Sequence, residues 1–113
     1  MKRIFVFLLF SALTSIASAQ FAGPSVAGRA STVAQVNEAR VGSYIVVTGR
    51  IVAHQRADYF TFRDATGEIR VEIENVVWQS RQIGPDTKVR LLAEVDRGVG
   101  GRYLWVKSLE VVE

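Results

Sequence analysis

The chain has 113 residues, with 14 Lys and Arg against 11 Asp and Glu, and it contains no cysteine. This length fits one domain, and the composition excludes disulfide bonds and a cysteine nucleophile. A core alone must therefore hold the domain together, and a closed β-sheet is an economical way to build one.

The first residues have the pattern of a secretory signal peptide. Lys2 and Arg3 precede an apolar run over residues 4–13, and small residues follow at Ala17 to Ala19. We expect a signal peptide at residues 1–19, with cleavage between Ala19 and Gln20 and export to the periplasm. The apolar run is too short to span a bilayer comfortably, and the rest of the chain shows no other candidate span.

Export also changes the charge of the protein. Removal of Lys2 and Arg3 leaves 12 basic against 11 acidic residues, a net charge of +1. The mature protein is therefore close to neutral, which is poor support for binding to a polyanion.

Residues 20–31 are rich in Gly, Pro and Ser and predict a mobile, irregular N-terminus before a domain at residues 32–113. Apolar residues at helical spacing then predict a short helix up to about Arg40, with Gly42 just past its end. Ser31 or Thr32 is expected to cap the first amides of this helix.

A long strand is predicted from Tyr44 to Gln55. Its alternation places one set of residues inward and another outward, with Gly49 marking a bend in the middle. The inward set is Ile45, Val47, Gly49, Ile51 and Ala53, and the outward set includes Thr48, Arg50 and His54.

A β-hairpin is predicted over Tyr59 to Ile73, because two alternating runs flank a short turn. Asp64 is expected to accept a hydrogen bond from the backbone ahead of it, and Gly67 can adopt a positive φ. The inward residues of the hairpin are Phe60, Phe62, Ile69, Val71 and Ile73.

The remaining chain predicts two more strands. The broken alternation over residues 75–80 predicts a connector, and Trp78 within it is expected to plug one end of a barrel. Strands follow at residues 87–95 and 103–112, joined by a hairpin loop at 96–102 that contains three glycines. A slip near Ser108 is expected to return Leu109 and Val111 to the core.

This order of strands predicts an all-β fold with one short N-terminal helix, a five-stranded Greek-key barrel of the OB-fold type. The alternative is an SH3-like barrel. The bent first strand and the single long connector after the third strand favour the OB-fold.

The sequence also resembles the bacterial OB-fold (BOF) family of periplasmic proteins, which includes envelope stress-tolerance proteins. The resemblance rests on Gly49-Arg50-Ile51-Val52, on the run from Tyr59 to Ile69, on Trp78 and on Glu94-Val95-Asp96. It implies a periplasmic barrel that binds small molecules, envelope glycans or proteins instead of nucleic acid.

The outward face of the first three strands is the main candidate for ligand binding, because an aromatic ring lies there among hydrogen-bonding and charged groups. The alternative is a solvated face with ion pairs across strands. The candidate residues are Arg50, His54, Tyr59, Thr61, Arg63, Arg70 and Glu72.

A second candidate site groups polar residues around the hairpin turn and at the end of the fourth strand. Paired carboxylates could hold a cation or act as acid and base. The alternatives are a turn-stabilising role for Asp64 and ion pairs of Glu94 and Asp96 with Arg63 or Arg90. The group comprises Asp64, Thr66, Gly67, Glu68, Glu94 and Asp96.

The sequence offers no set of residues typical of an enzyme. His54 is the only histidine, so a histidine metal cluster and a Ser-His-Asp set are not indicated. We therefore expect a non-enzymatic binding protein without cofactor or metal. The alternative is a single-stranded nucleic-acid binder, since Tyr59 and Arg63 could stack on bases.

Overall fold

The computed structural model describes residues 28–112, in which six strands and two short helices follow one another. The elements are β1 (Arg29–Ala30), the 3₁₀-helix η4 (Val33–Glu38), β2 (Tyr44–Arg56), β3 (Tyr59–Asp64), β4 (Gly67–Glu72), α1 (Asn75–Trp78), β5 (Val89–Gly98) and β6 (Gly101–Val111). No helix within these residues has the length and apolar character needed to cross a membrane.

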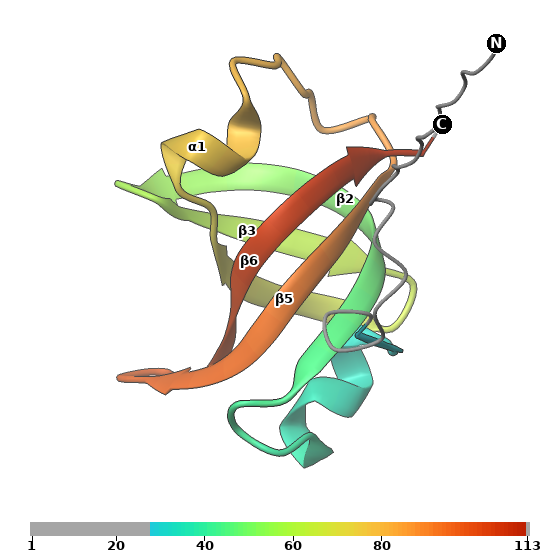
Figure 1. Ribbon diagram of the computed structural model, residues 1–113, viewed down its shortest axis with the longest axis vertical. Helices are drawn as coiled ribbons and strands as arrows, with labels where there is room; N and C mark the ends of the chain where they lie inside the picture. Colours follow the sequence, from blue (N-terminus) through green and yellow to red (C-terminus); the bar gives the residue numbers. More distant parts are fainter. Residues whose placement is uncertain (1–27, 113) are drawn as a thin grey trace, which may run out of the picture.

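Strands β2 to β6 close into a barrel (Figure 1). The strand order is β1-β2-β3-β4-β6-β5, and β5 pairs back onto β2. Strands β4 and β6 pair in parallel, whereas the other pairs within the barrel are antiparallel. This arrangement confirms the predicted all-β OB-fold.

Strand β2 bends at Gly49, as predicted, because it changes partners there. Residues 44–49 pair with β5, and from Arg50 onward the strand pairs with β3. A Cβ atom on Gly49 would lie 2.2 Å from the carbonyl oxygen of Arg63. Gly49 is therefore required by the close approach of the β3 backbone.

Two register shifts change the phase of β2 beyond the bend. They lie between Ile51 and Ala53 and between His54 and Arg56. Ile51 is buried as predicted, but Ala53 is exposed, because the first shift turns it to the outer side. The predicted inward position of Ala53 is therefore wrong.

The β3–β4 hairpin confirms the predicted turn. Asp64 pairs with Gly67 across the turn, and Asp64 Oδ1 accepts a 2.7 Å hydrogen bond from the amide of Thr66. Gly67 has a φ of +156°. Phe62, Val71 and Ile73 are fully buried, while Phe60 and Ile69 pack against the edge of the core.

The connector between β4 and β5 contains α1, which the sequence analysis did not predict. Trp78 is half-buried at its end, and its ring meets that of Phe60 edge-on at a centroid distance of 5.1 Å. Trp78 packs against the core, which agrees with the expected position at one end of the barrel. Helix α1 lies near one end of the barrel and η4, in cyan, near the other (Figure 1).

Strands β5 and β6 form the predicted hairpin, but the predicted bounds of its loop, residues 96–102, are wrong, because β5 continues to Gly98 and β6 begins at Gly101. Only Val99 and Gly100 lie between the two strands. A register shift opposite Leu92 and Ala93 makes the predicted slip near Ser108. It buries Leu109, but Val111 stays 44% exposed, so its predicted place in the core is also wrong.

The N-terminal part of the barrel differs from the expected irregular segment. Arg29 and Ala30 form β1, which pairs in parallel with β2, and the amide of Ser31 donates to the carbonyl of Val46 at 2.9 Å. The predicted signal peptide, its cleavage site and the rest of the expected mobile segment lie outside the described residues.

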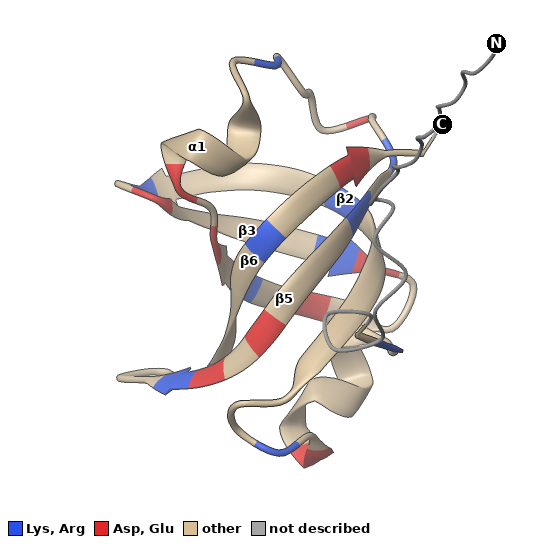
Figure 2. Cartoon of the chain, in the orientation of Figure 1, with Lys and Arg blue, Asp and Glu red and all other residues tan. Residues whose placement is uncertain are grey.

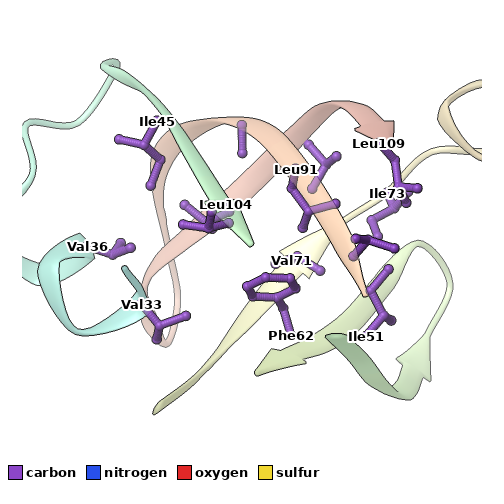
Figure 3. Close-up of a cluster of buried hydrophobic side chains, with 14 of the residues drawn as sticks. Val33, Val36, Ile45, Ile51, Phe62, Val71, Ile73, Leu91, Leu104 and Leu109 are labelled. Carbon is purple, nitrogen blue, oxygen red and sulfur yellow. The ribbon is translucent and has the colours of Figure 1, made fainter. Parts of the chain in front are cut away.

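The core is filled by aliphatic side chains around one phenyl ring (Figure 3). Phe62 of β3, Leu91 of β5 and Leu104 of β6 are fully buried. Val33 and Val36 of η4 are also buried and cover one end of the core. Because the inward side chains fill the core, the outward side chains of β2, β3, β4 and β6 form the surface on which the candidate sites lie.

Candidate functional site

An open groove of about 860 Å³ lies over the outer side of β2 and β3. Arg50, Thr61 and Arg63 of the predicted face line it together. The segment before β5 forms the other wall with Pro85, Asp86 and Lys88, so that wall comes from residues distant in sequence. The full lining is Thr48, Gly49, Arg50, Val52, Ala53, Thr61, Arg63, Asp64, Ala65, Glu68, Pro85, Asp86 and Lys88.

The groove is lined by charged residues of both signs, Arg50, Arg63 and Lys88 together with Asp64, Glu68 and Asp86. Basic and acidic residues are mixed along the strands of the barrel (Figure 2). Arg63 forms an ion pair with Glu68 and donates from Nε to Glu68 Oε2 at 2.7 Å. Arg50 donates from Nε to the carbonyl of Asp86 at 3.4 Å, which ties the groove wall to β2 only weakly. The groove is thus a mixed polar surface, unlike a continuous cationic track for phosphates.

Tyr59 and Arg70 of the predicted face lie in a separate cluster with Tyr103 of β6. The guanidinium carbon of Arg70 is 5.1 Å from the ring centroids of both tyrosines, and Arg56 lies 5.7 Å from that of Tyr59. Tyr103 was not among the predicted residues. Its alternation with Leu104 does predict an outward position, but its contact with Arg70 depends on the parallel pairing of β4 and β6.

Burial raises the pKa of Tyr103 to about 12, and the negative charges of Asp96 and Glu72 add to this shift. The hydroxyl of Tyr103 donates to Asp96 Oδ2 at 3.3 Å. Tyr103 therefore stays a neutral donor at physiological pH. Glu72 of the predicted face lies opposite Tyr59 in the β3–β4 pairing, which places it beside the tyrosine cluster.

His54 does not join the other predicted face residues. The second half of β2 is out of phase, so His54 pairs with Phe60 and stacks on its ring at a centroid distance of 4.5 Å. Its Nε2 is 2.8 Å from the carbonyl oxygen of Ala57. His54 thus belongs to an aromatic stack with Phe60 and Trp78 at the barrel end, away from Arg50.

Asp64 and Thr66 of the second candidate group cap η4. Asp64 Oδ2 accepts from the amide of Val33 at 2.9 Å, and Thr66 Oγ1 accepts from that of Ala34 at 2.9 Å. Thr66 also donates its hydroxyl to Asp64 Oδ1 at 2.6 Å. Thr32 is the N-cap residue of η4, as expected, and forms a capping box with Gln35, whose Oε1 accepts from the amide of Thr32 at 3.0 Å. The amides of Val33 and Ala34, however, donate to Asp64 and Thr66 instead of to a hydroxyl of Ser31 or Thr32.

This cap changes the ionisation of Asp64. Partial burial alone would raise the pKa of its carboxyl, but hydrogen bonds from the Thr66 hydroxyl and from the amides of Val33, Thr66 and Gly67 lower the pKa below 3.8. Asp64 is thus a carboxylate with a structural role, poorly suited to donate a proton in catalysis.

Glu94 and Asp96 pair differently from the predicted ion pairs with Arg63 or Arg90. Glu94 lies 3.7 Å from the ammonium group of Lys107, whereas Arg63 is engaged by Glu68 and Arg90 by Glu110. The reason is the register, which places Glu94 opposite Trp105 and beside Lys107 on β6. Residues 28–112 contain no cluster of three His, Cys, Asp or Glu that could hold a metal ion.

Comparison with known proteins identifies a family and several relatives. Residues 11–111 match the family described as Bacterial OB fold (BOF) protein. The chain is 36% identical over 105 residues to the Calcium-regulated OB-fold protein CarO of Pseudomonas aeruginosa, a match covering 93% of this chain and 89% of that protein. Protein YgiW of Escherichia coli is 28% identical over 85 residues, or 75% of this chain and 65% of that protein.

Solved structures give the same result for the fold. The structure of ygiW from E. coli superposes with a TM-score of 0.71 at 28% identity, covering 76% of this chain and 92% of that one. The second OB-fold domain of replication protein A from Methanococcus maripaludis gives a TM-score of 0.58 at 16% identity, covering 75% and 96%. At that identity the likeness extends to the fold alone.

Proposed function

The chain belongs to the bacterial OB-fold (BOF) family, and on this premise we propose that it is a non-enzymatic binding protein of the periplasm. It holds a small molecule, an envelope glycan or a protein partner in the groove over β2 and β3, and it supports tolerance of envelope stress. The observation that carries this proposal is the 860 Å³ groove, whose size lies within the range of about 300–1,000 Å³ typical of ligand sites.

The chemistry of the groove fits binding better than catalysis. Thr48 and Thr61 offer hydroxyls, and Val52 and Ala53 offer apolar surface between cationic side chains. Such a mixture can cover a ligand and fix its orientation. Two of the acidic residues that line the groove, Asp64 and Glu68, are already engaged by η4 and by Arg63.

Export to the periplasm rests on the basic, apolar and small-residue pattern of residues 1–19. We expect the protein recovered from the periplasm to begin at Gln20, with the OB-fold domain over residues 32–113. N-terminal sequencing of that protein checks this expectation. Recovery of the chain from the cytoplasm with its leader intact would contradict it.

The position of the groove predicts which residues a bound ligand contacts. Titration of ¹⁵N-labelled protein with peptidoglycan fragments or soluble envelope proteins is expected to shift the amide resonances of Thr48, Ala53 and Thr61. Replacing Arg50 by Ala is expected to weaken binding about tenfold, because one charge-assisted hydrogen bond is lost.

Arg90→Ala is the matched control, since Arg90 is an exposed strand arginine paired with Glu110 outside the groove. It is expected to bind as the wild type does. If no resonance in the groove moves at millimolar ligand, or if both variants bind equally, the groove is not the site.

Binding of single-stranded nucleic acid is the competing function, and the tyrosine and arginine cluster of β3, β4 and β6 is the observation in its favour. Its signature is a fluorescence polarisation change with oligo-dT that falls steeply with salt and is lost in Tyr59→Ala or Arg70→Ala. The net charge of +1 expected for the mature protein and the Arg63–Glu68 ion pair favour the opposite result.

A further inference from the structure

Arg70 is held in a fixed orientation on the outer side of β4. Its guanidinium lies 5.1 Å from the ring centroids of Tyr59 and Tyr103, whose rings meet edge to face at 6.2 Å. A Cβ atom on Gly98 would lie 3.0 Å from Arg70 Nη2, so the glycine leaves room for the end of the side chain. Little conformational entropy remains to be lost when this guanidinium binds a ligand.

The charge of Arg70 is not balanced by an ion pair within residues 28–112. Glu68, on the same face of β4, is engaged by Arg63, and Asp96 accepts from the hydroxyl of Tyr103. Arg70 Nε is buried and has no hydrogen-bond partner among the described residues. A guanidinium without an ion pair favours an anionic partner, which residues 28–112 do not supply.

A second groove, of about 600 Å³, reaches Arg70 between η4, β4 and the β5–β6 hairpin. Arg102 adds a second guanidinium, of which Nε donates to the carbonyl of Ala39 at 3.1 Å. Asn37 adds an amide and Thr66 a hydroxyl, and Gly100 and Gly101 leave the hairpin backbone open to a ligand. The groove thus combines cationic forks with neutral hydrogen-bonding groups.

We infer that this second groove binds a small hydroxylated carboxylate, such as a sugar acid, with its carboxylate on Arg70. A carboxylate matches the planar fork of a guanidinium in a bidentate contact, and the hydroxyls match the amide and backbone groups beside it. Glu68 and Glu72 flank Arg70 along β4, so a phosphate dianion is repelled more strongly than a singly charged carboxylate. The inference rests on the proposed binding function, although it concerns a different groove.

The test uses D-glucuronate as the probe, with D-glucose and inorganic phosphate as the arms that separate carboxylate, hydroxyl and general anion binding. In the wild-type protein, glucuronate is expected to shift the Arg70 Nε–Hε resonance and the amides of Gly100 to Tyr103. Glucose and phosphate are expected to leave them in place. This measurement needs no variant, so it does not depend on how a substitution folds.

Arg70→Lys keeps the charge but loses the planar fork, and it is expected to weaken glucuronate binding about tenfold. Arg90→Lys is the control and is expected to bind as the wild type does. The inference is overturned if glucuronate leaves the Arg70 Nε–Hε resonance unmoved at millimolar concentration, if glucose or phosphate binds equally well, or if Arg70→Lys binds unchanged.

The resonance shifts distinguish the proposed function from the Arg70 site, because the two grooves have different lining residues. Shifts confined to Thr48, Ala53 and Thr61 would retain the proposed function and overturn the Arg70 site. Shifts confined to Arg70 and the β5–β6 hairpin would support the site while removing the groove over β2 and β3 from the proposal. Loss of both would overturn both.

Discussion

Replacing Gly49 by alanine is expected to lower the free energy of unfolding by about 3 kcal/mol or more, through overpacking of backbone against backbone. The added Cβ would lie 2.2 Å from the carbonyl oxygen of Arg63 and 2.9 Å from Cζ of Phe62. A flexible side chain could move aside, but the Arg63 carbonyl belongs to β3, which pairs with β2 at the next residue. Relief therefore requires the two strands to separate where β2 changes partners.

Urea unfolding followed by far-ultraviolet circular dichroism measures this loss. Gly84→Ala is the matched control, because a Cβ there meets no atom within 4 Å and the residue precedes a proline in an exposed segment. The control is expected to stay within about 0.5 kcal/mol of the wild type. Equal stability of Gly49→Ala and the wild type would show that β3 does not approach β2 this closely.

Replacing Asp64 by alanine is expected to cost about 2–3 kcal/mol, because it removes a helix cap and a turn in one step. Its two oxygens accept from the amides of Val33 and Thr66 at 2.9 and 2.7 Å and from the Thr66 hydroxyl. Thr66→Val removes part of the same network, so the double variant is expected to lose less than the sum of the single ones. Urea unfolding at neutral pH checks both statements.

The lowered pKa of Asp64 also predicts how the free energy of unfolding depends on pH. Its folded pKa is lowered below 3.8, so the folded state binds the proton less readily than the unfolded chain does. The stabilisation is therefore full above the unfolded pKa and is lost as pH falls through the folded pKa. Asp64→Asn has no proton to gain and should lose less stability than the wild type between about pH 5 and pH 2.

Asp86→Ala is the control for both experiments, since within the described residues its carboxylate makes no hydrogen bond and only its backbone carbonyl accepts from Arg50. We expect it to stay within about 0.5 kcal/mol of the wild type. An equal acid dependence of Asp64→Asn and the wild type would mean that the carboxylate does not hold η4.

The barrel itself was predictable because its signals are local. The alternation of apolar and polar residues predicts which side of each strand is buried. It correctly predicted Phe62, Leu91 and Leu104 as core residues. The turn at Asp64 was also predictable, since its first hydrogen bond reaches only two residues ahead. The hairpin between β5 and β6 was predicted, but its loop was predicted too long, because the glycines of that segment are typical of loops.

The site depended on information that alternation does not carry. Register shifts in β2 moved His54 to the side of Phe60 and left Arg50 beside Thr61 and Arg63. Such shifts follow from the curvature that a closed barrel imposes on its longest strand, and each one reverses the inside and outside positions that follow it.

The sequence alone determined an all-β barrel, its core and the residues available on its outer face. Which of those residues come into contact depends on how the strands pair and close. Asp64 reaches the amide of Val33 across 31 positions, and Arg70 reaches Tyr103 across the parallel seam of β4 and β6. Burial of an alternating strand is a property of neighbouring residues, whereas these contacts exist only once the sheet has closed.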